Sequence, residues 1–452
     1  MSDLARAEGP PAAALPVVRL RLGALLRAWA PLAVVLATFL TVSTVYNLRV
    51  PLYEAPDEIA HARYVRSIAQ DGELPRFRSV EEYESWQPPL YYAVGAAALK
   101  GLSLDSPPEL EWNPNFYATG DPQNFIHGAE EDFPYSEPVL AVHILRAVNT
   151  LFGAGTIIFI YLTALLVFPR RRLLAFTAAA TASLIPQFAF ISSTVSNDPS
   201  SFFFASAIVY FGLRYLRESS TALLVLAAAA VSLGALAKVS TLVVAVVPLV
   251  AILLQSIPWQ RKIPLLAVLA LLPIAVAGWF YVRSVILWGS FYPDDLFWKL
   301  NPLPIWNSRY REDFLQPLRE SFWYTGGPAN IRLASIIYDL LNVTFVLAVA
   351  GVIVTFMSAR LSAFEKRGLA LLSALPALAL AMLLYFSVEH DFQQQGRYLF
   401  SAIPGFAILL PLGIGALFSR DRLRDHAAML SVPALLLAVN LYVFTVTLPD
   451  YY

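Results

Sequence analysis

Repeated apolar runs of about twenty residues dominate this chain, and that is the length of helix that crosses a bilayer. Because a bilayer offers the backbone no hydrogen-bond partners, such runs must form helices. We therefore expect an all-α polytopic membrane protein with about eleven transmembrane helices. The predicted spans cover residues 27–48, 139–168, 173–193, 200–217, 220–237, 239–256, 264–288, 334–357, 368–388, 398–418 and 427–447.

The break at Lys238 and the nature of the first span follow from the residues around them. The stretch 220–256 is too long for one crossing and is interrupted by Lys238, so we predict two short helices that meet at this lysine. The first span follows several arginines and lacks a small-residue cleavage site, which indicates an uncleaved helix rather than a signal peptide.

The composition agrees with a single membrane domain. Only 14% of the 452 residues are charged, against roughly 25% in soluble domains. The net charge is zero, so nothing indicates a nucleic-acid partner. There is no cysteine, which excludes disulfides, thiol nucleophiles and cysteine metal sites.

Short basic loops set the expected orientation, because Lys and Arg are enriched in cytoplasmic loops. Placing the N-terminus in the cytoplasm puts every short basic loop on the same side. These loops hold Arg170–Arg172, Arg214, Arg217, Arg261, Lys262, Arg360, Lys366, Arg367, Arg420, Arg422 and Arg424. We expect a cytoplasmic tail (1–26), one integral domain (27–447) in the plasma or inner membrane, and an outer C-terminal tail (448–452). The long loops 49–138 and 289–333 then lie on the outer side.

The first outer loop begins with a predicted amphipathic helix. Pro56 and Asp57 suit a helix start, and Asp71-Gly72 suits its end. The apolar residues of this segment would form one face lying on the membrane surface; they are Ile59, Ala62, Val65, Ile68 and Ala69. Asp57, His61 and Tyr64 would share another face. Two plainer interpretations stand beside this one: Asp57 and Glu58 favour a helix start, and His61 is solvated.

A second juxtamembrane helix is predicted at 89–103, after the pair Pro88-Pro89. It is short, and segment 105–138 after it holds eight acids and no Lys or Arg. If segment 89–103 crossed the membrane, the orientation of all later spans would be inverted. We therefore place this helix in the membrane–water interface.

Further polar residues fall near the predicted outer ends of spans. They are Asp198, Lys238, Tyr281 with Arg283, and the segment 393–398, which contains Gln395, Arg397 and Tyr398. Each has a plain interpretation as a cap, a snorkelling lysine or an interfacial anchor. Together they place acids on one loop and cations at several outer helix ends. A transfer reaction from a phosphate-bearing lipid needs this combination, with an acid as base and cations on the leaving phosphate.

The order of these motifs resembles the GT-C glycosyltransferase superfamily, which uses polyprenyl-phosphate sugars. It is similar above all to bacterial members related to glycosyltransferase family 39, the protein O-mannosyltransferases and the aminoarabinose transferases. The motifs are Pro56-Asp57-Glu58, Gln87-Pro88-Pro89-Leu90-Tyr91-Tyr92, Ser196-Asn197-Asp198-Pro199, Ala237-Lys238, Gly278–Arg283 and Gln395-Gly396-Arg397-Tyr398.

The resemblance implies inverting transfer, outside the cytoplasm, from a lipid-phosphate sugar. It implies that Asp57 is the base and that Glu58 binds acceptor or metal. Lys238 and Arg397 would face the carrier phosphate. The remaining residues of the implied substrate site are Asp198, Arg283, Gln395, Tyr398, His61 and Tyr91.

No large C-terminal soluble domain is found, which favours a glycan or lipid acceptor over a peptide. Mg²⁺ or Mn²⁺ could be held by Asp57, Glu58 and Asp198. Three other functions remain as alternatives: a transporter or flippase of lipid-linked glycans, a ligase or polymerase acting on a pyrophosphate carrier, and a non-catalytic subunit of the same fold.

Overall fold

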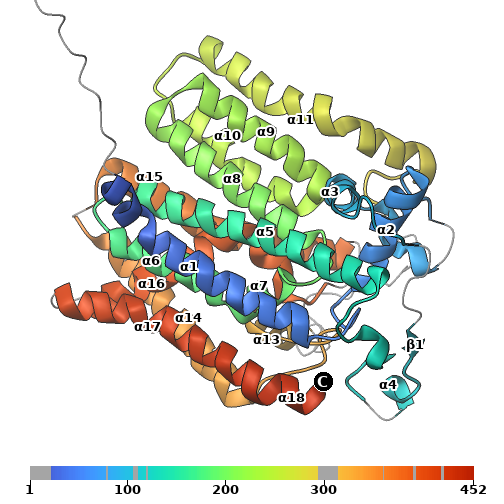
Figure 1. The fold of residues 1–452 in the computed structure, drawn as a ribbon. Coiled ribbons are helices and arrows are strands. Elements are labelled where there is room, and N and C mark those ends of the chain that lie inside the picture. Colours follow the sequence, from blue (N-terminus) through green and yellow to red (C-terminus); the bar gives the residue numbers. More distant parts are fainter. Residues whose placement is uncertain are drawn as a thin grey trace, which may run out of the picture.

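The computed structural model describes residues 22–77, 80–104, 110–118, 121–293, 314–359, 361–389, 393–418 and 422–452. The structure is a bundle of long helices with a smaller lobe at one end (Figure 1). Residues 1–21 of the predicted tail (1–26), the loop residues 294–313, and Arg360 and Arg420 of the basic loops lie outside the described residues.

Helices occupy all eleven predicted spans. They are α1 (Leu22–Arg49), α5 (Glu137–Val167), α6 (Arg172–Leu184) with α7 (Pro186–Ile191), α8 (Asp198–Glu218), α9 (Thr221–Ala237), η3 (Val239–Ala245) with α10 (Val246–Leu253), α11 (Trp259–Trp288), α14 (Ser335–Met357), α15 (Ala363–Glu389), η6 (Gly396–Ala402) with α16 (Ile403–Phe418), and α17 (Arg422–Tyr442) with η7 (Val443–Thr447). The polytopic all-helical class is therefore confirmed.

Seven of these segments are long and apolar enough to cross a membrane, counting only the described residues. They are α1, α5, α11, α14, α15, η6–α16 and the segment from α17 to α18 (Leu448–Tyr451). The segments α6, α9 and η3–α10 are apolar but shorter, and α8 carries charged residues at both ends. The count of about eleven crossings stays a prediction.

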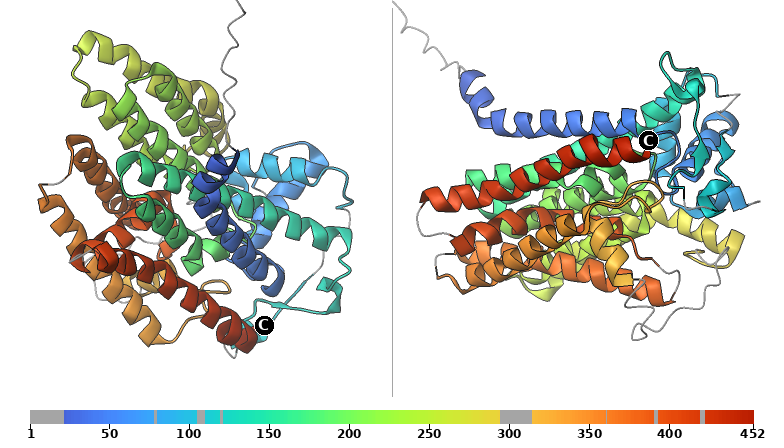
Figure 2. Two further views of the ribbon diagram at one scale, coloured as in Figure 1. Left: turned by 60° about the vertical axis from the view of Figure 1, so that its left-hand side comes forward. Right: turned by 90° about the horizontal axis from the view of Figure 1, so that it is seen from below.

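Contacts between neighbouring helices order the bundle. Helices α8 to α11 form one group, α14, α16 and α17 form another, and α5 and α6 lie between them (Figures 1 and 2). Helices α14 and α16 approach closely because Gly351 and Gly413 face each other: a Cβ on Gly351 would lie 1.8 Å from the Gly413 carbonyl oxygen. Small residues permit such backbone contact between membrane helices.

The break predicted at Lys238 is confirmed. Helix α9 ends at Ala237, Lys238 is extended (φ −164°), and η3 begins at Val239. The helical backbone is interrupted here, and the Lys238 ammonium contacts the Asp198 carboxylate.

The lobe at one end of the bundle, the end predicted to be the outer one, is built from short elements of the first long loop (Figure 2). They are α2 (Glu58–Asp71), η1 (Val80–Trp86), α3 (Leu90–Ala98), β1 (Glu111–Trp112), α4 (Asn115–Ala118), β2 (Phe125–Ile126) and η2 (Ala129–Glu131). Strands β1 and β2 pair antiparallel. The two predicted juxtamembrane helices are thus present, although α3 is shorter than expected.

The burial of α2 differs from the prediction. Glu58, His61 and Tyr64 are buried together with Val65, whereas Ile59 and Ala62 are only partly buried. The polar face of α2 therefore packs into the protein. His61 is 3% exposed, so its interpretation as a solvated side chain was wrong.

A partly buried cluster of His127, Glu54 and Glu131 joins the lobe to the chain after α1. The His127 ring lies 2.9 Å from Glu54 and 2.6 Å from Glu131. Glu54 also accepts backbone hydrogen bonds from Asn124 and Phe125. Burial lowers the pKa of His127, but the hydrogen bonds to Glu131 and Glu54 outweigh it and raise the pKa to about 9.

Candidate active site

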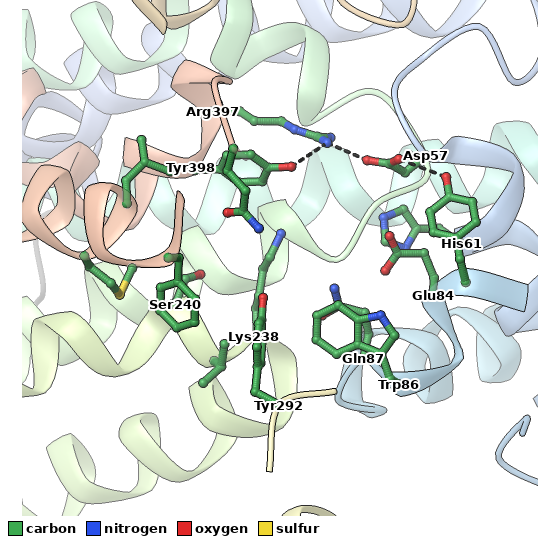
Figure 3. Close-up of a pocket in the computed structure, with 16 residues that line it drawn as sticks. Asp57, His61, Glu84, Trp86, Gln87, Lys238, Ser240, Tyr292, Arg397 and Tyr398 are labelled. Atoms are coloured by element: carbon green, nitrogen blue, oxygen red, sulfur yellow. Dashed lines mark hydrogen bonds and ion pairs between the residues drawn. The ribbon is translucent and has the colours of Figure 1, made fainter. Parts of the chain in front are cut away.

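A polar pocket of about 190 Å³ lies where this lobe meets the helix ends (Figure 3). Its described lining comes from α2, η1, η3, α15 and η6, with Tyr292 from the chain after α11 (Trp259–Trp288); these segments are far apart in the sequence. The chemically capable side chains among them are Asp57, His61, Tyr83, Glu84, Lys238, Arg397 and Tyr398. Five of these seven were predicted from the sequence.

Asp57 stands at the start of α2 in the left-handed conformation, with φ 64° and ψ 4°. A non-glycine residue adopts this conformation at some energetic cost, and the surrounding contacts must hold it. Its carboxylate does not cap the helix. Instead it accepts hydrogen bonds from the Tyr83 hydroxyl (2.9 Å) and the Arg397 guanidinium (2.5 Å).

These contacts keep Asp57 ionised. Burial alone would raise the pKa of its carboxyl, but the positive charge of Arg397, with a smaller effect of His61, lowers the pKa below its ordinary value. Asp57 is thus a carboxylate at neutral pH, as a proton acceptor must be.

Two cations of the pocket lining are paired with a second acid, Asp198, which is not part of the described lining. Lys238 contacts Asp198 at 2.5 Å, and Arg397 lies 3.6 Å from the other oxygen of the same carboxylate. Asp198 therefore serves as a counter-ion, and its side chain does not cap α8 as the plainer interpretation held. The Tyr398 ring lies 5.2 Å from the Lys238 ammonium and 5.1 Å from the Arg397 guanidinium.

The position of Arg397 depends on the glycine before it. Gly396 begins η6 and lies against α13 (Gln316–Trp323); a Cβ there would be 2.3 Å from the Phe322 backbone nitrogen. The Gly396 N–H also donates to the Ser321 hydroxyl at 2.7 Å. This contact fixes the start of η6, and hence the depth at which Arg397 enters the pocket.

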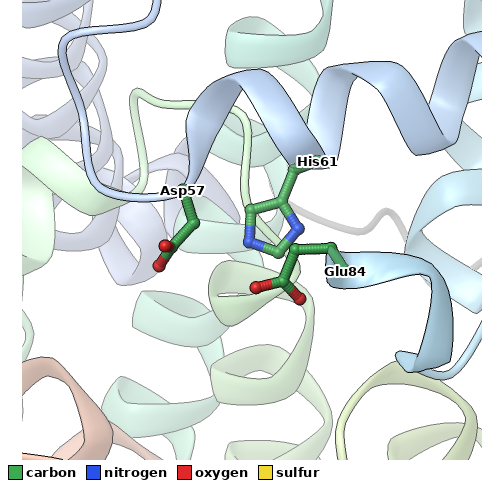
Figure 4. A group of neighbouring side chains, drawn as sticks. All are labelled: Asp57, His61 and Glu84. Atoms are coloured by element: carbon green, nitrogen blue, oxygen red, sulfur yellow. The ribbon is translucent and has the colours of Figure 1, made fainter. Parts of the chain in front are cut away.

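His61 and Glu84 also line the pocket (Figure 4). One potential ligand atom from each of Asp57, His61 and Glu84 lies within 4.8 Å of the others. Burial lowers the pKa of His61 to about 3, so the ring is neutral; its Nδ1 lies 2.8 Å from the Tyr92 hydroxyl. Burial, reinforced by the charge of Asp57, raises the pKa of Glu84 to about 8. Among the described residues, Glu84 Oε2 has no hydrogen-bond partner.

Glu58 does not take the place in the site that the sequence predicted for it. It points away from the pocket, and its carboxylate accepts two hydrogen bonds of 2.8 Å from Arg146 and one from the Val195 backbone N–H. Both side chains are 0% exposed. A catalytic or metal-binding role for Glu58 does not fit this geometry, because its oxygens are already occupied by buried partners.

Glu58 and Arg146 instead join the two acid-bearing loops. Arg146 also donates to the carbonyls of Asn47, Val50 and Pro51, before α2. One turn further along α5, Asn149 donates to the carbonyls of Thr194 and Ser196, before α8. The polar face of α5 therefore sets where Asp57 and Asp198 stand relative to each other.

Three other predicted residues are not part of the described pocket lining. Arg283 donates to the Pro75 carbonyl at 3.0 Å and lies over the Trp288 ring. The Tyr91 hydroxyl, buried, accepts a hydrogen bond from Asn149. Gln395 precedes η6, and its carbonyl accepts a hydrogen bond from the Tyr398 N–H. These positions indicate supporting roles.

Sequence reasoning missed Tyr83, Glu84 and Arg146. Glu84 stands four residues before Pro88-Pro89, but η1 has no periodic pattern that would place its side chain. Arg146 left a clearer signal: it is a charged residue inside the second predicted span, and such residues are costly unless they are paired.

The fold and the pocket together define a class, the polytopic helical membrane proteins with a polar pocket at one end of the helix bundle. The sequence profile of a family described as dolichyl-phosphate-mannose-protein mannosyltransferase matches residues 142–281. A search of curated protein sequences found no match.

Among solved structures, the chain is similar to ArnT from Cupriavidus metallidurans bound to undecaprenyl phosphate. The TM-score is 0.51 at 17% identity, over 92% of this chain and 65% of ArnT. The archaeal oligosaccharyltransferase AglB from Archaeoglobus fulgidus, in complex with an inhibitory peptide and a dolichol-phosphate, gives a TM-score of 0.48 at 11% identity, over 92% of this chain and 56% of AglB. The chain thus spans less than two thirds of either relative. The GT-C resemblance noted in the motifs is confirmed at the level of the fold by the ArnT comparison.

Proposed function

We propose that this protein is a membrane glycosyltransferase that moves a sugar from a polyprenyl-phosphate carrier to a hydroxyl of a glycan or lipid acceptor. One observation carries the proposal: the Asp57 carboxylate and the cations Lys238 and Arg397 line a single pocket. The matching family profile is described as a mannosyltransferase, and ArnT, which has a similar fold, was solved with undecaprenyl phosphate bound; both support this reaction class. The pocket faces away from the cytoplasm in the orientation that the basic loops predict.

The proposed step is an inverting displacement. The acceptor oxygen bonds to the anomeric carbon while the bond from that carbon to the carrier phosphate oxygen breaks. The hydroxyl proton passes to Asp57, and the carrier leaves as polyprenyl phosphate. Lys238 and Arg397 stabilise the negative charge that develops on the departing phosphate.

Without donor, both cations are occupied by Asp57 and Asp198. A donor phosphate would compete with Asp57 for Arg397. Asp57 would then lose the contact that lowers its pKa most and become a stronger proton acceptor when the donor is in place.

A divalent cation fits one side of this pocket. Glu58 and Asp198 are engaged by Arg146 and Lys238, so the set proposed from the sequence does not converge. Asp57, His61 and Glu84 do converge, and the unpartnered Glu84 oxygen suits a ligand role. The carboxylate oxygens suit Mg²⁺ or Mn²⁺, and the neutral His61 imidazole offers a nitrogen ligand beside them. A cation held there would lower the pKa of a bound hydroxyl.

The variant Asp57→Asn tests the proposal. We expect it to bind a radiolabelled polyprenyl-phosphate sugar and to transfer none of it, since the amide cannot accept the proton. The matched control is Asp71→Asn, which removes the same charge at the exposed end of α2 and should keep full activity. Transfer by Asp57→Asn would remove Asp57 from the mechanism. Donor movement across vesicles without transfer would favour a flippase instead.

A further inference from the structure

A second hollow of about 600 Å³ lies at the opposite end of the bundle from the pocket, and its rim is basic. Helix α5 connects the two ends: Arg146 supports the pocket, and Val167 at the end of α5 lines the hollow. At 1.5 Å per residue this separation is about 30 Å, the thickness of the hydrocarbon core. The hollow therefore lies at the other membrane interface, on the side predicted to be cytoplasmic.

Three arginines from three separate segments line this hollow. Arg170 follows α5, Arg217 is in the last turn of α8, and Arg367 is in the first turns of α15. Arg217 is held in place: it donates to the Leu166 carbonyl at 3.1 Å and lies over the Phe364 ring. Arg170 and Arg367 are exposed, and neither forms an ion pair within the described chain.

The carboxylate in the described lining does not neutralise these cations. Glu365 accepts the Ser362 backbone N–H at 2.7 Å, while the Ser362 hydroxyl accepts the Glu365 N–H at 3.2 Å. This reciprocal pair caps the start of α15. The hollow thus keeps an excess of positive charge. Its wall is apolar, with Val167, Leu216 and Leu361 buried.

We propose that this hollow binds an anionic phospholipid of the adjoining leaflet, with its phosphate between Arg170 and Arg367 and an acyl chain against the apolar wall. Guanidinium groups bind phosphate oxygens in a fork geometry, and basic pockets between membrane helices bind anionic headgroups. Basic residues are expected in cytoplasmic loops and do not by themselves indicate a binding site. Here three of them converge on one hollow, whereas Arg171 and Arg261 on the same side do not line it. The proposal does not depend on the glycosyltransferase assignment.

The test uses the full chain in neutral detergent with phosphatidylglycerol as the probe, and retained lipid is read by native mass spectrometry. We expect phosphatidylglycerol to be retained in preference to phosphatidylcholine. The double variant Arg170→Gln/Arg367→Gln should bind it about thirtyfold more weakly, because each basic residue near an anionic headgroup contributes a factor of about five. Arg217 is left intact, since it also supports the packing of α8.

The control Arg171→Gln/Arg261→Gln removes the same charge from the same side and should bind as the unaltered protein does. Equal losses in both double variants would mean unspecific attraction and overturn the proposal, as would equal retention of the two lipids by the unaltered protein. Inorganic phosphate is the second probe: if it displaces the lipid at equal concentration, the hollow is a site for free phosphate and the lipid assignment fails. Thermal unfolding confirms that both variants are folded.

Discussion

Arg146 and Glu58 form a fully buried ion pair, with two guanidinium nitrogens each 2.8 Å from one carboxylate oxygen. Glu58 is the direct neighbour of Asp57, and the same carboxylate binds the loop that leads to Asp198. The pair therefore connects the placement of the proposed base to the placement of the acid that holds Lys238.

Removing one member of this pair should destabilise the protein strongly. Arg146→Met leaves the Glu58 charge buried without its partner, which typically costs about 3–5 kcal/mol. We expect a large fall in the unfolding temperature in detergent. The matched control is Arg214→Met, which breaks the exposed pair with Glu218 and should cost about 0.5 kcal/mol or less. A folded, fully stable but inactive Glu58→Gln protein would contradict us and return Glu58 to a catalytic role.

Replacing Arg397 should affect the donor step specifically. Arg397→Gln removes the positive charge proposed to stabilise the leaving phosphate, and losing one such group typically lowers the rate by roughly 10²–10³-fold. Steady-state kinetics should show this loss in kcat/KM for the donor, with the acceptor KM little changed. Arg76→Gln, an exposed arginine outside the described pocket lining, serves as the control. An unaltered donor kcat/KM in the Arg397 variant would disprove phosphate contact.

The His127 cluster should make stability depend on alkaline pH. The pKa of His127 is about 9 in the folded protein, above its ordinary value of 6.5. Its stabilising effect is thus complete below about pH 6.5 and is lost as the pH rises through about 9. We expect His127→Gln to lower the unfolding temperature clearly at pH 6.5 and much less at pH 10. A constant difference across this range would exclude the charged imidazole as the cause.

Chelation and a double variant of His61 and Glu84 test whether the transfer activity depends on a metal ion. If the three-residue group holds Mn²⁺, chelation with EDTA should lower transfer activity and added Mn²⁺ should restore it. The variant His61→Ala/Glu84→Gln should then lose the Mn²⁺ response, and electron paramagnetic resonance should show no bound Mn²⁺. Unchanged activity in EDTA would show that these side chains act without a metal ion.

Much of this architecture could be predicted from hydropathy, because lipid forces each spanning segment to be helical. The break at Lys238 was predictable for the same reason, since a charge interrupts an apolar stretch there. Motif order brought Asp57, Lys238, Arg397 and Tyr398 into one expected site, and the structure places them in one pocket.

The directions of neighbouring side chains could not be predicted. Asp57 and Glu58 are adjacent acids, yet one faces the pocket and the other is buried against α5. The left-handed backbone at Asp57 contributes to this divergence, and no sequence pattern indicates that conformation for an aspartate. Glu84 was missed because only the tertiary fold brings η1 over the pocket.

The absence of a side chain at Gly396 fixes how closely η6 approaches α13. A single methyl group there would act as a spacer between η6 and the Phe322 backbone, pushing the start of η6 away from α13. Such a substitution would shift the Arg397 charge without altering any polar group. The position of the Arg397 guanidinium in the pocket therefore depends on residue 396, which is not part of the described pocket lining.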